Sequence, residues 1–179
     1  MALEQTESFG LTLPGKRLTS IQFYNVNENY FVFHPKSLAV IDGGVELDFE
    51  GQKLVIGWNS ERALFDVDTN SIKPLLGEED YYQIESADLP IGQNLIGLML
   101  ISLEPKWNWF QDTNDEMEPI GPKHYIPMEV ILRFENGHTF QIAAIQYEIE
   151  DRKLSNVSYD CQNELLLSVD QIVPIENTL

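Results

Sequence analysis

Alternation of hydrophobic and polar residues with a period of two is the feature that most restricts the fold of this sequence. In the stretch 45–56, Val, Leu and Phe alternate with Glu and Asp before Gly51. Such alternation is typical of half-buried strands, and a glycine between two such runs predicts a turn. The stretch 130–142 repeats the arrangement around Asn136-Gly137, a dipeptide that supplies the positive φ angles of a tight hairpin turn. Two antiparallel hairpins are therefore predicted.

Seven further stretches are rich in β-branched, aromatic or aliphatic residues, which favours strands. They are residues 18–26, 30–33, 38–41, 95–103, 139–149, 157–161 and 165–169. No segment holds an apolar period of 3.6 residues over three turns, and only 60–65 and 73–76 are expected to form a short helical turn each. The sequence therefore predicts a mainly β fold, an antiparallel β-sandwich or barrel-like domain, with an α+β fold as the alternative.

Length and composition predict a single domain over residues 1–179. A chain of 179 residues of which 43% are hydrophobic can bury most of the surface that its unfolded form exposes. Two similar halves, 15–88 and 92–170, are a further hypothesis, because the two hairpins look alike and come after similar lead-ins that begin at Gly15 and Gly92. Short hairpins also converge on the same alternation and turn residues without duplication, so both explanations stay open.

The acidic charge of the chain restricts its partners. Eleven lysine and arginine residues against 29 aspartate and glutamate residues give a formal net charge of −18. This charge repels phosphate backbones and anionic lipid headgroups, so nucleic acids and membrane surfaces are not expected as partners. It speeds the encounter with a basic protein, which makes a basic protein the partner class that the charge favours. Solubility alone is the alternative reason for such a charge.

The single cysteine, Cys161, excludes an internal disulfide and favours a compartment in which thiols stay reduced. The first residues are acidic and lack the basic stretch and apolar run of a secretory signal. The longest apolar stretch, 95–103, is shorter than the ~20 residues that a membrane helix needs. We therefore expect a soluble, cytoplasmic protein. Because no basic residue neighbours Cys161 in the sequence, we interpret it as a small buried hydrophobic residue and not as a nucleophile.

One segment begins like a calcium-binding loop. Asp66, Asp68 and Asn70 place oxygen ligands at its first, third and fifth positions. The remaining positions do not fit, because Ser71 stands where the sharp turn needs glycine and Gly77 stands where a bidentate glutamate closes the shell. These three residues are weak metal candidates, and a polar turn after a strand is the better interpretation. No cofactor is expected.

The stretch 111–127 is rich in aspartate, glutamate, proline and glycine, which predicts a long acidic loop with a functional role or mobility. The aromatic cluster before it, Trp107-Asn-Trp109-Phe110, is a contact candidate because tryptophan at a loop edge often anchors a protein interface. In a strand, Trp107 and Trp109 share one face and Phe110 takes the other. Burial in the core is the alternative for these rings.

No catalytic motif is complete in the sequence. The histidines, His34, His124 and His138, are dispersed without the spacing of a zinc site. No nucleophile elbow, phosphate-binding glycine loop or dinucleotide fingerprint is present, and a turn between strands explains the pair Gly43-Gly44. Carboxylates are so abundant that no pair stands out as an acid–base couple. An enzyme is therefore the less favoured function.

Two functions are compatible with these observations. The favoured one is an acidic protein-binding module that binds or neutralises a basic protein. In charge and size alone the chain is similar to bacterial immunity proteins that neutralise basic toxins, and no motif identifies a family. Its interaction candidates are Trp107, Trp109, Asp112, Asp115, Glu116 and Glu118. The alternative is a small-molecule-binding β domain or a hydrolase-like enzyme with a site assembled from scattered carboxylates and histidines. An exposed apolar patch with an acidic rim would favour the protein-binding module. A closed pocket with convergent titratable groups would favour the small-molecule site or enzyme.

Overall fold

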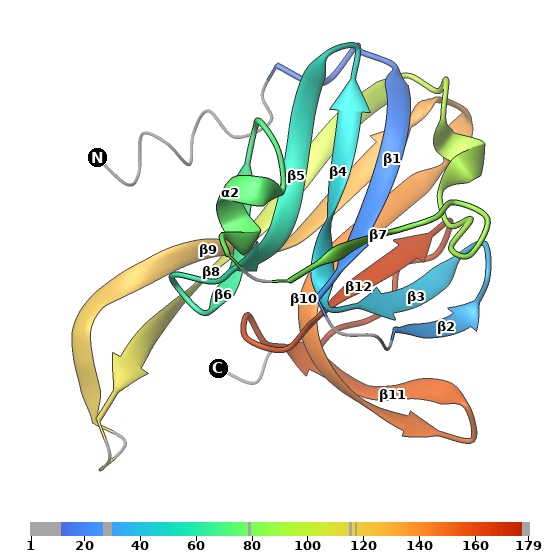
Figure 1. Ribbon diagram of the computed structural model, residues 1–179. Helices are drawn as coiled ribbons and strands as arrows, with labels where there is room; N and C mark the ends of the chain where they lie inside the picture. The colour runs from blue at the N-terminus through green and yellow to red at the C-terminus, as the bar shows by residue number, and fades with distance from the viewer. Residues whose placement is uncertain (1–11, 27–29, 79, 115, 117, 177–179) are drawn as a thin grey trace.

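Two antiparallel β-sheets make up the computed structural model of the protein, which describes residues 12–26, 30–78, 80–114, 116 and 118–176 (Figure 1). The five-stranded sheet contains, in spatial order, β6 (Leu64–Asp68), β5 (Gln52–Asn59), β4 (Gly43–Phe49), β1 (Leu18–Asn25) and β7 (Tyr82–Ile84). The seven-stranded sheet runs in the order β2 (Phe31–His34), β3 (Leu38–Ile41), β12 (Glu164–Val169), β10 (Thr139–Glu150), β9 (Pro119–Phe134) and β8 (Leu100–Thr113), and β11 (Lys153–Tyr159) pairs with β10. The mainly β prediction is confirmed in its sandwich form.

One hydrophobic core fills the space between the two sheets. Val45 and Leu47 on β4 and Ile142 on β10 are fully buried in it, because alternate side chains of each strand point to the inner face. The rings of Phe49 and Phe134 stack across the two layers with their centroids 6.4 Å apart. The sheets therefore share a single interior.

Both predicted hairpins are present. Strands β4 and β5 pair up to Phe49 and Gln52 and turn at Gly51, whose φ is +86°. Strands β9 and β10 are joined by the short 3₁₀ turn η2 (Glu135–Gly137), in which Asn136 and Gly137 have φ angles of 65° and 81°. The left-handed backbone that these residues tolerate is therefore used where the sequence predicts it. The short helix α2 (Lys73–Leu76) confirms the helical turn expected there.

Two local predictions are wrong. Residues 60–65 form no helical turn, because a turn at 60–63, with a positive φ of 51° at Ala63, leads directly into strand β6. The stretch 95–103 is only partly a strand: the 3₁₀ turn η1 (Gln93–Leu95) and a further turn precede β8, which begins at Leu100. Each stretch contains fully buried residues, Leu64 in the first and Leu95 and Leu100 in the second, but a buried apolar residue does not by itself distinguish a strand from a turn that packs on the core.

The pair Gly43-Gly44 lies inside strand β4 and not in a turn, so that prediction is also wrong. A Cβ atom on Gly43 would lie 2.3 Å from the carbonyl oxygen of Tyr24 on the neighbouring strand. A Cβ on Gly44 would lie 2.7 Å from the Cα of Gly57 on β5. The glycines are therefore required for the close approach of three backbones, a constraint that local sequence does not reveal.

The two hypothetical halves contribute differently to the sandwich. Strands from residues 15–88 divide between both sheets, whereas the strands from residues 92–170 all belong to the seven-stranded sheet. Duplication stays a hypothesis from the sequence. Within the described part of the chain, no helix has the length and apolar character needed to cross a membrane.

The segment after β12 covers the outer face of the seven-stranded sheet. The amide of the fully buried Gln141 donates to the carbonyl oxygen of Val173 (3.0 Å) and accepts from its N–H (2.8 Å). Further along, Glu176 pairs with Ser158 on β11 in a parallel bridge. The segment is therefore fixed to both β10 and β11, and the outer face of this sheet holds a second set of buried apolar side chains.

Candidate functional site

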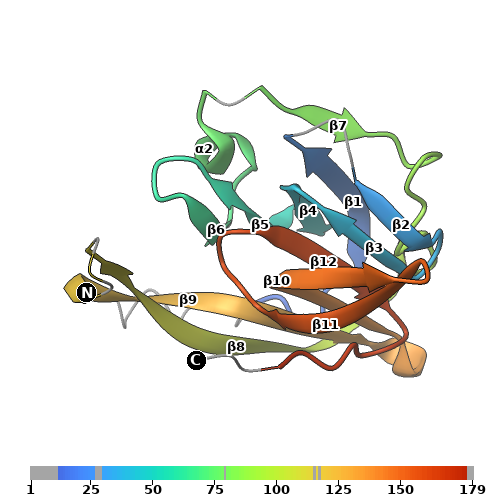
Figure 2. The ribbon, with the colours of Figure 1, turned by 90° about the horizontal axis from the view of Figure 1, so that it is seen from below.

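Strands β8 and β9 continue beyond the sandwich as a two-stranded ribbon, residues 106–128, which we call the arm (Figures 1 and 2). β10 pairs with β9 only between Glu129 and Arg133, so the arm has no third strand beyond that point among the residues that the structure describes. The two strands stay paired as far as Thr113 and Pro119. The arm projects away from the body of the molecule in both views.

The prediction of a loop over 111–127 is therefore wrong. Only residues 114–118 connect the strands, and the rest of the stretch belongs to β8 and β9. Proline and glycine, which indicate a loop, are tolerated in a ribbon of two strands because each strand has an edge that needs no backbone hydrogen bond. The composition is thus that of an edge ribbon.

An asparagine closes the tip of the arm. The Asn114 side-chain oxygen accepts hydrogen bonds from the backbone N–H groups of Glu116 (3.0 Å) and Glu118 (2.9 Å), and the backbone N–H of Asn114 donates to the Glu118 carbonyl oxygen (3.0 Å). Such side-chain bonds fix a tight turn. Both glutamates are exposed, so the arm ends in acidic side chains.

One face of the arm is aromatic. Trp109 lies directly across from Tyr125, and Trp107 lies across from Pro127 on the same face. Trp109 is 39% exposed and Tyr125 is 59% exposed. The ammonium of Lys123 lies 3.5 Å from the centroid of the Trp109 ring, a cation–π contact. We call Trp107, Trp109, Lys123 and Tyr125 the aromatic face.

The opposite face of the arm is anchored to the sandwich at its root. Ile126 and Met128 are buried against Leu64 of β6 and against Tyr159 and Cys161. Because neighbouring residues of a strand point to opposite faces, burial of Ile126 directs Tyr125 outward. The root therefore determines which side of the arm is presented to solvent.

A buried carboxylate also stabilises the root. Glu129 is 3% exposed, and its Oε2 accepts hydrogen bonds from the Tyr159 hydroxyl (2.7 Å) and the Lys106 ammonium (2.9 Å). Its Oε1 accepts one from the Gln141 amide (2.5 Å). The Lys106 ammonium donates to the Tyr159 hydroxyl as well (2.6 Å). We call these four residues the root network; sequence patterns do not reveal it because its members come from four separate strands or strand ends.

The root network is built to hold the arm and not to transfer protons to a substrate. Both oxygens of Glu129 already accept hydrogen bonds from protein groups, and the carboxylate is enclosed. A general base needs a free oxygen within reach of the proton that it removes. No described buried polar side-chain atom is left without a partner, and Glu129 follows that rule.

Two groups at the root of the arm, Tyr159 and Cys161, predict a loss of stability at alkaline pH. Burial, followed by the Glu129 carboxylate, raises the pKa of Tyr159 from 10.0 to about 12, and burial raises the pKa of the Cys161 thiol from 9.0 to about 11. The folded state therefore binds more protons than the unfolded state above pH 9, so these contributions are complete below that pH and are lost as the pH rises toward 12. Urea denaturation at increasing pH should show that the free energy of unfolding falls by on the order of 2 kcal/mol through the titration of Tyr159 alone. Tyr159→Phe should flatten this decline, and an equally steep decline in that variant would assign it to other groups.

The structure brings some of the interaction candidates together. Trp107 and Trp109 lie on one face of the arm, as strand geometry predicts, and Glu116 and Glu118 lie at its tip. Asp112 pairs through its backbone with Ile120 in the ribbon, while its side chain and Asp115 lie outside what the structure describes, as does the side chain of Phe110. Lys123 and Tyr125 are not among the predicted contact residues, although a ribbon in this register places Tyr125 opposite Trp109.

The weak metal candidates have protein partners. Asp66 forms an ion pair with Arg62, and its other carboxylate oxygen accepts the N–H of Val67 (2.9 Å). Asp68 accepts the N–H of Asn70 (2.6 Å), which closes a polar turn. No group of three or more His, Cys, Asp or Glu residues is close enough to hold a metal ion in the portion of the chain that the structure describes.

The histidines and the cysteine do not converge. His34 shares a hydrogen bond with the Ser37 hydroxyl (2.7 Å), and His138 lies 3.0 Å from the Asp170 carboxylate, while the side chain of His124 is outside the described part. Cys161 is buried, as its interpretation as a small hydrophobic residue requires. Its raised pKa keeps the thiol protonated at neutral pH, which does not suit a nucleophile.

No protein-family model matches this chain, and neither a curated protein nor a solved structure is significantly similar to it.

Proposed function

We propose that the protein is a binding module that holds a basic protein partner through its arm. The observation that carries the proposal is the pair Trp109 and Tyr125, two large exposed rings that lie across from each other on a ribbon projecting from the sandwich. Tryptophan and tyrosine are the side chains that most often anchor protein interfaces. A projecting ribbon can insert them into a partner without distorting the body of the module.

Charge supports a basic partner. The net charge of −18 attracts a basic protein over long range, and the exposed Glu116 and Glu118 place acidic groups at the tip of the same arm. Lys123 already places a cation on the Trp109 ring, so the ring environment accepts the type of group that a basic partner offers. An exposed aromatic patch with an acidic tip is the arrangement expected of a binding scaffold.

Side chains, and not strand addition, are the means of contact that we propose. The outer edge of β8 is unpaired by any described strand, and a long edge of that kind readily pairs with another chain. In β8 the register shifts at three places, between Leu100 and Ser102, Lys106 and Trp107, and Phe110 and Asp112, and Pro105 interrupts the edge. Bulges and proline protect an edge from pairing, which leaves the aromatic face as the contact surface.

Affinity capture from the native lysate tests the proposal. The tagged protein should retain a stoichiometric basic protein at low salt, identified by mass spectrometry, and release it at high salt because the attraction is screened. Trp109→Ala combined with Tyr125→Ala should weaken the retained complex at least tenfold, the effect of losing two anchor residues, with an unchanged melting temperature.

Phe31→Ala is the matched control for the loss of an exposed ring. Phe31 is 45% exposed and lies on β2, the strand at the other edge of the seven-stranded sheet from β8. This control should retain the partner as the wild type does. Equal retention by the arm variant and the wild type, or capture of acidic proteins only, would reject the proposal.

A further inference from the structure

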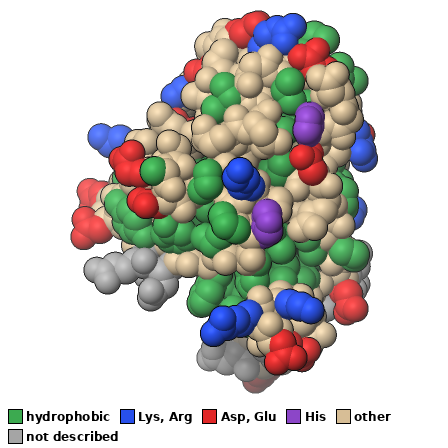
Figure 3. Space-filling view, turned by 90° about the vertical axis from the view of Figure 1, so that its right-hand side faces the viewer, with side chains coloured by type: hydrophobic (Ala, Val, Ile, Leu, Met, Phe, Trp, Pro, Cys, Tyr) green, Lys and Arg blue, Asp and Glu red, His purple; other side chains and the backbone are tan. Residues whose placement is uncertain are grey.

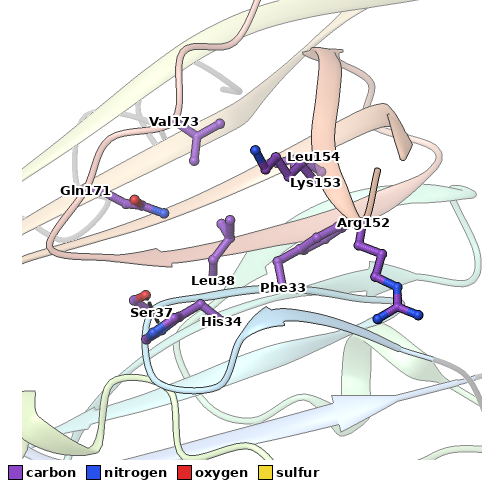
Figure 4. A pocket seen from close by; sticks show the side chains of 9 residues that line it. All are labelled: Phe33, His34, Ser37, Leu38, Arg152, Lys153, Leu154, Gln171 and Val173. Atoms are coloured by element: carbon purple, nitrogen blue, oxygen red, sulfur yellow. Dashed lines mark hydrogen bonds between the residues drawn. The ribbon is translucent and has the colours of Figure 1, made fainter. Parts of the chain in front are cut away.

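A groove of about 380 Å³ opens on the outer side of the seven-stranded sheet, away from the arm. Three parts of the chain line it: the turn between β2 and β3, the start of β11, and the segment after β12 (Figure 4). Its volume falls within the range of small-molecule sites, which is about 300–1,000 Å³. Because the groove shares no residue with the arm, a ligand site here is independent of the proposed function of the arm.

The charge of the groove is opposite to that of the protein as a whole. Arg152 and Lys153 line it, and no acidic residue is among the described residues that do so, although acids outnumber bases in the chain by 29 to 11. Neither cation forms an ion pair with any residue that the structure describes, although Glu150 lies across from Lys153 in the β10–β11 pair. Two cations without a described ion-pair partner favour an anionic ligand at this place.

Turn geometry does not explain the presence of Arg152. It occupies a left-handed position, with a φ of 63°, in the tight turn between β10 and β11. Glycine or asparagine suits that position better, and other residues cost stability there. In Figure 4 the Arg152 guanidinium extends away from the other lining side chains, so Lys153 is the cation that faces the groove.

The floor of the groove is apolar. Phe33, Leu38, Leu154 and Val173 are half-buried and pack on the buried cluster that covers the outer face of the sheet. The space-filling view of this side shows hydrophobic side chains gathered in a band with basic and histidine side chains next to it (Figure 3). A ligand that covered this floor would remove apolar surface from water, which favours binding.

Polar groups surround the floor. Figure 4 shows the Lys153 ammonium reaching toward the segment after β12, from which the Gln171 amide points into the groove. On the facing side, the Ser37 hydroxyl and His34 are joined by their 2.7 Å hydrogen bond. A cation beside an amide donor can hold a carboxylate, and the aliphatic part of the same ligand can then lie on the floor.

We propose that this groove binds a small aliphatic carboxylate, with its carboxylate at Lys153 and Gln171 and its chain over Leu38 and Val173. Each part of the ligand is required. The net negative charge of the protein repels a free anion, so the electrostatic attraction to the groove alone gives a small anion too little binding free energy. An uncharged aliphatic ligand leaves the cations of the groove without an anionic partner.

Titration calorimetry of the full chain with decanoate, below its micelle concentration, tests the proposal. Decanoate should bind saturably with one site per chain, whereas acetate and decanol should bind at least tenfold more weakly. Lys153→Gln should weaken decanoate binding about tenfold, the effect of losing one charge-assisted contact. Absence of saturable decanoate binding, or decanol binding as tightly as decanoate, would overturn the proposal.

Lys36→Gln is the matched control, because Lys36 is an exposed cation on the nearby turn between β2 and β3 and does not line the groove. It should change decanoate affinity less than twofold. Arg152→Gly combined with Lys153→Gln should remove saturable binding and keep or raise the melting temperature, because glycine suits the turn. Equal effects of Lys36→Gln and Lys153→Gln would show that decanoate responds to overall charge alone, and would reject the groove as its site.

Discussion

Glu129→Ala is expected to lower the free energy of unfolding by about 3 kcal/mol, measured by urea denaturation at neutral pH. The substitution removes the acceptor for the buried Tyr159 hydroxyl and one acceptor for the buried Gln141 amide, and it leaves a void at the root of the arm. Lys106 is 62% exposed and regains water, which keeps the loss below that of a fully buried ion pair.

Glu104→Ala is the control for this substitution. Glu104 on β8 forms an ion pair with Arg133 on β9, and both side chains are about half exposed, at 50% and 46%. Because water screens an exposed pair, its loss should cost less than about 1 kcal/mol. Similar losses for the two variants would mean that water replaces the Glu129 carboxylate, and the root network would then not stabilise the arm.

Gly43→Ala is expected to cost about 3 kcal/mol as well, for a steric reason. The added Cβ would lie 2.3 Å from the Tyr24 carbonyl oxygen and 2.8 Å from the Cα of Asn25. Both atoms belong to the backbone of β1, which pairs with β4, so no side chain can rotate away to make room. Thermal and urea denaturation of the purified variant would measure the loss.

Gly51→Ala separates this steric effect from the general effect of replacing a glycine. Gly51 lies in the turn after β4, has a φ of +86°, and would have nothing within 4 Å of an added Cβ. Its replacement should cost about 1 kcal/mol through the left-handed backbone alone. If Gly43→Ala is no more destabilising than Gly51→Ala, strands β1 and β4 move apart at little cost and the close approach is not required.

The two proposals place recognition on different parts of one scaffold. The arm offers exposed rings with an acidic tip, which suit a basic macromolecule, while the groove offers cations over an apolar floor, which suit a small anion. The surface variants of the arm and the groove should therefore act independently, because the two sites share no residues. Decanoate binding should be unchanged in the Trp109→Ala, Tyr125→Ala variant.

The alternation of hydrophobic and polar residues and the turn-forming residues, both visible in the sequence, determined the β class and both hairpins. Asn136-Gly137 can adopt two consecutive positive φ angles at little cost, so its hairpin follows from the dipeptide and the flanking alternation. The position of Trp107 and Trp109 on the same face of β8 follows in the same way from the two-residue period of a strand. These features depend only on residues that are close along the chain.

Tertiary structure alone decided the rest, because it depends on which distant strands become neighbours. Gly43 is a strand residue only because the β1 backbone passes against it. Residues 111–113 and 119–127 form strands only because each half of the ribbon supplies the other with hydrogen bonds. The root network and the groove likewise join residues from separate strands. Each short stretch of sequence shows the alternation of one strand but does not show which strand pairs with it. The sequence therefore determined the secondary structure class, and strand pairing determined the sites.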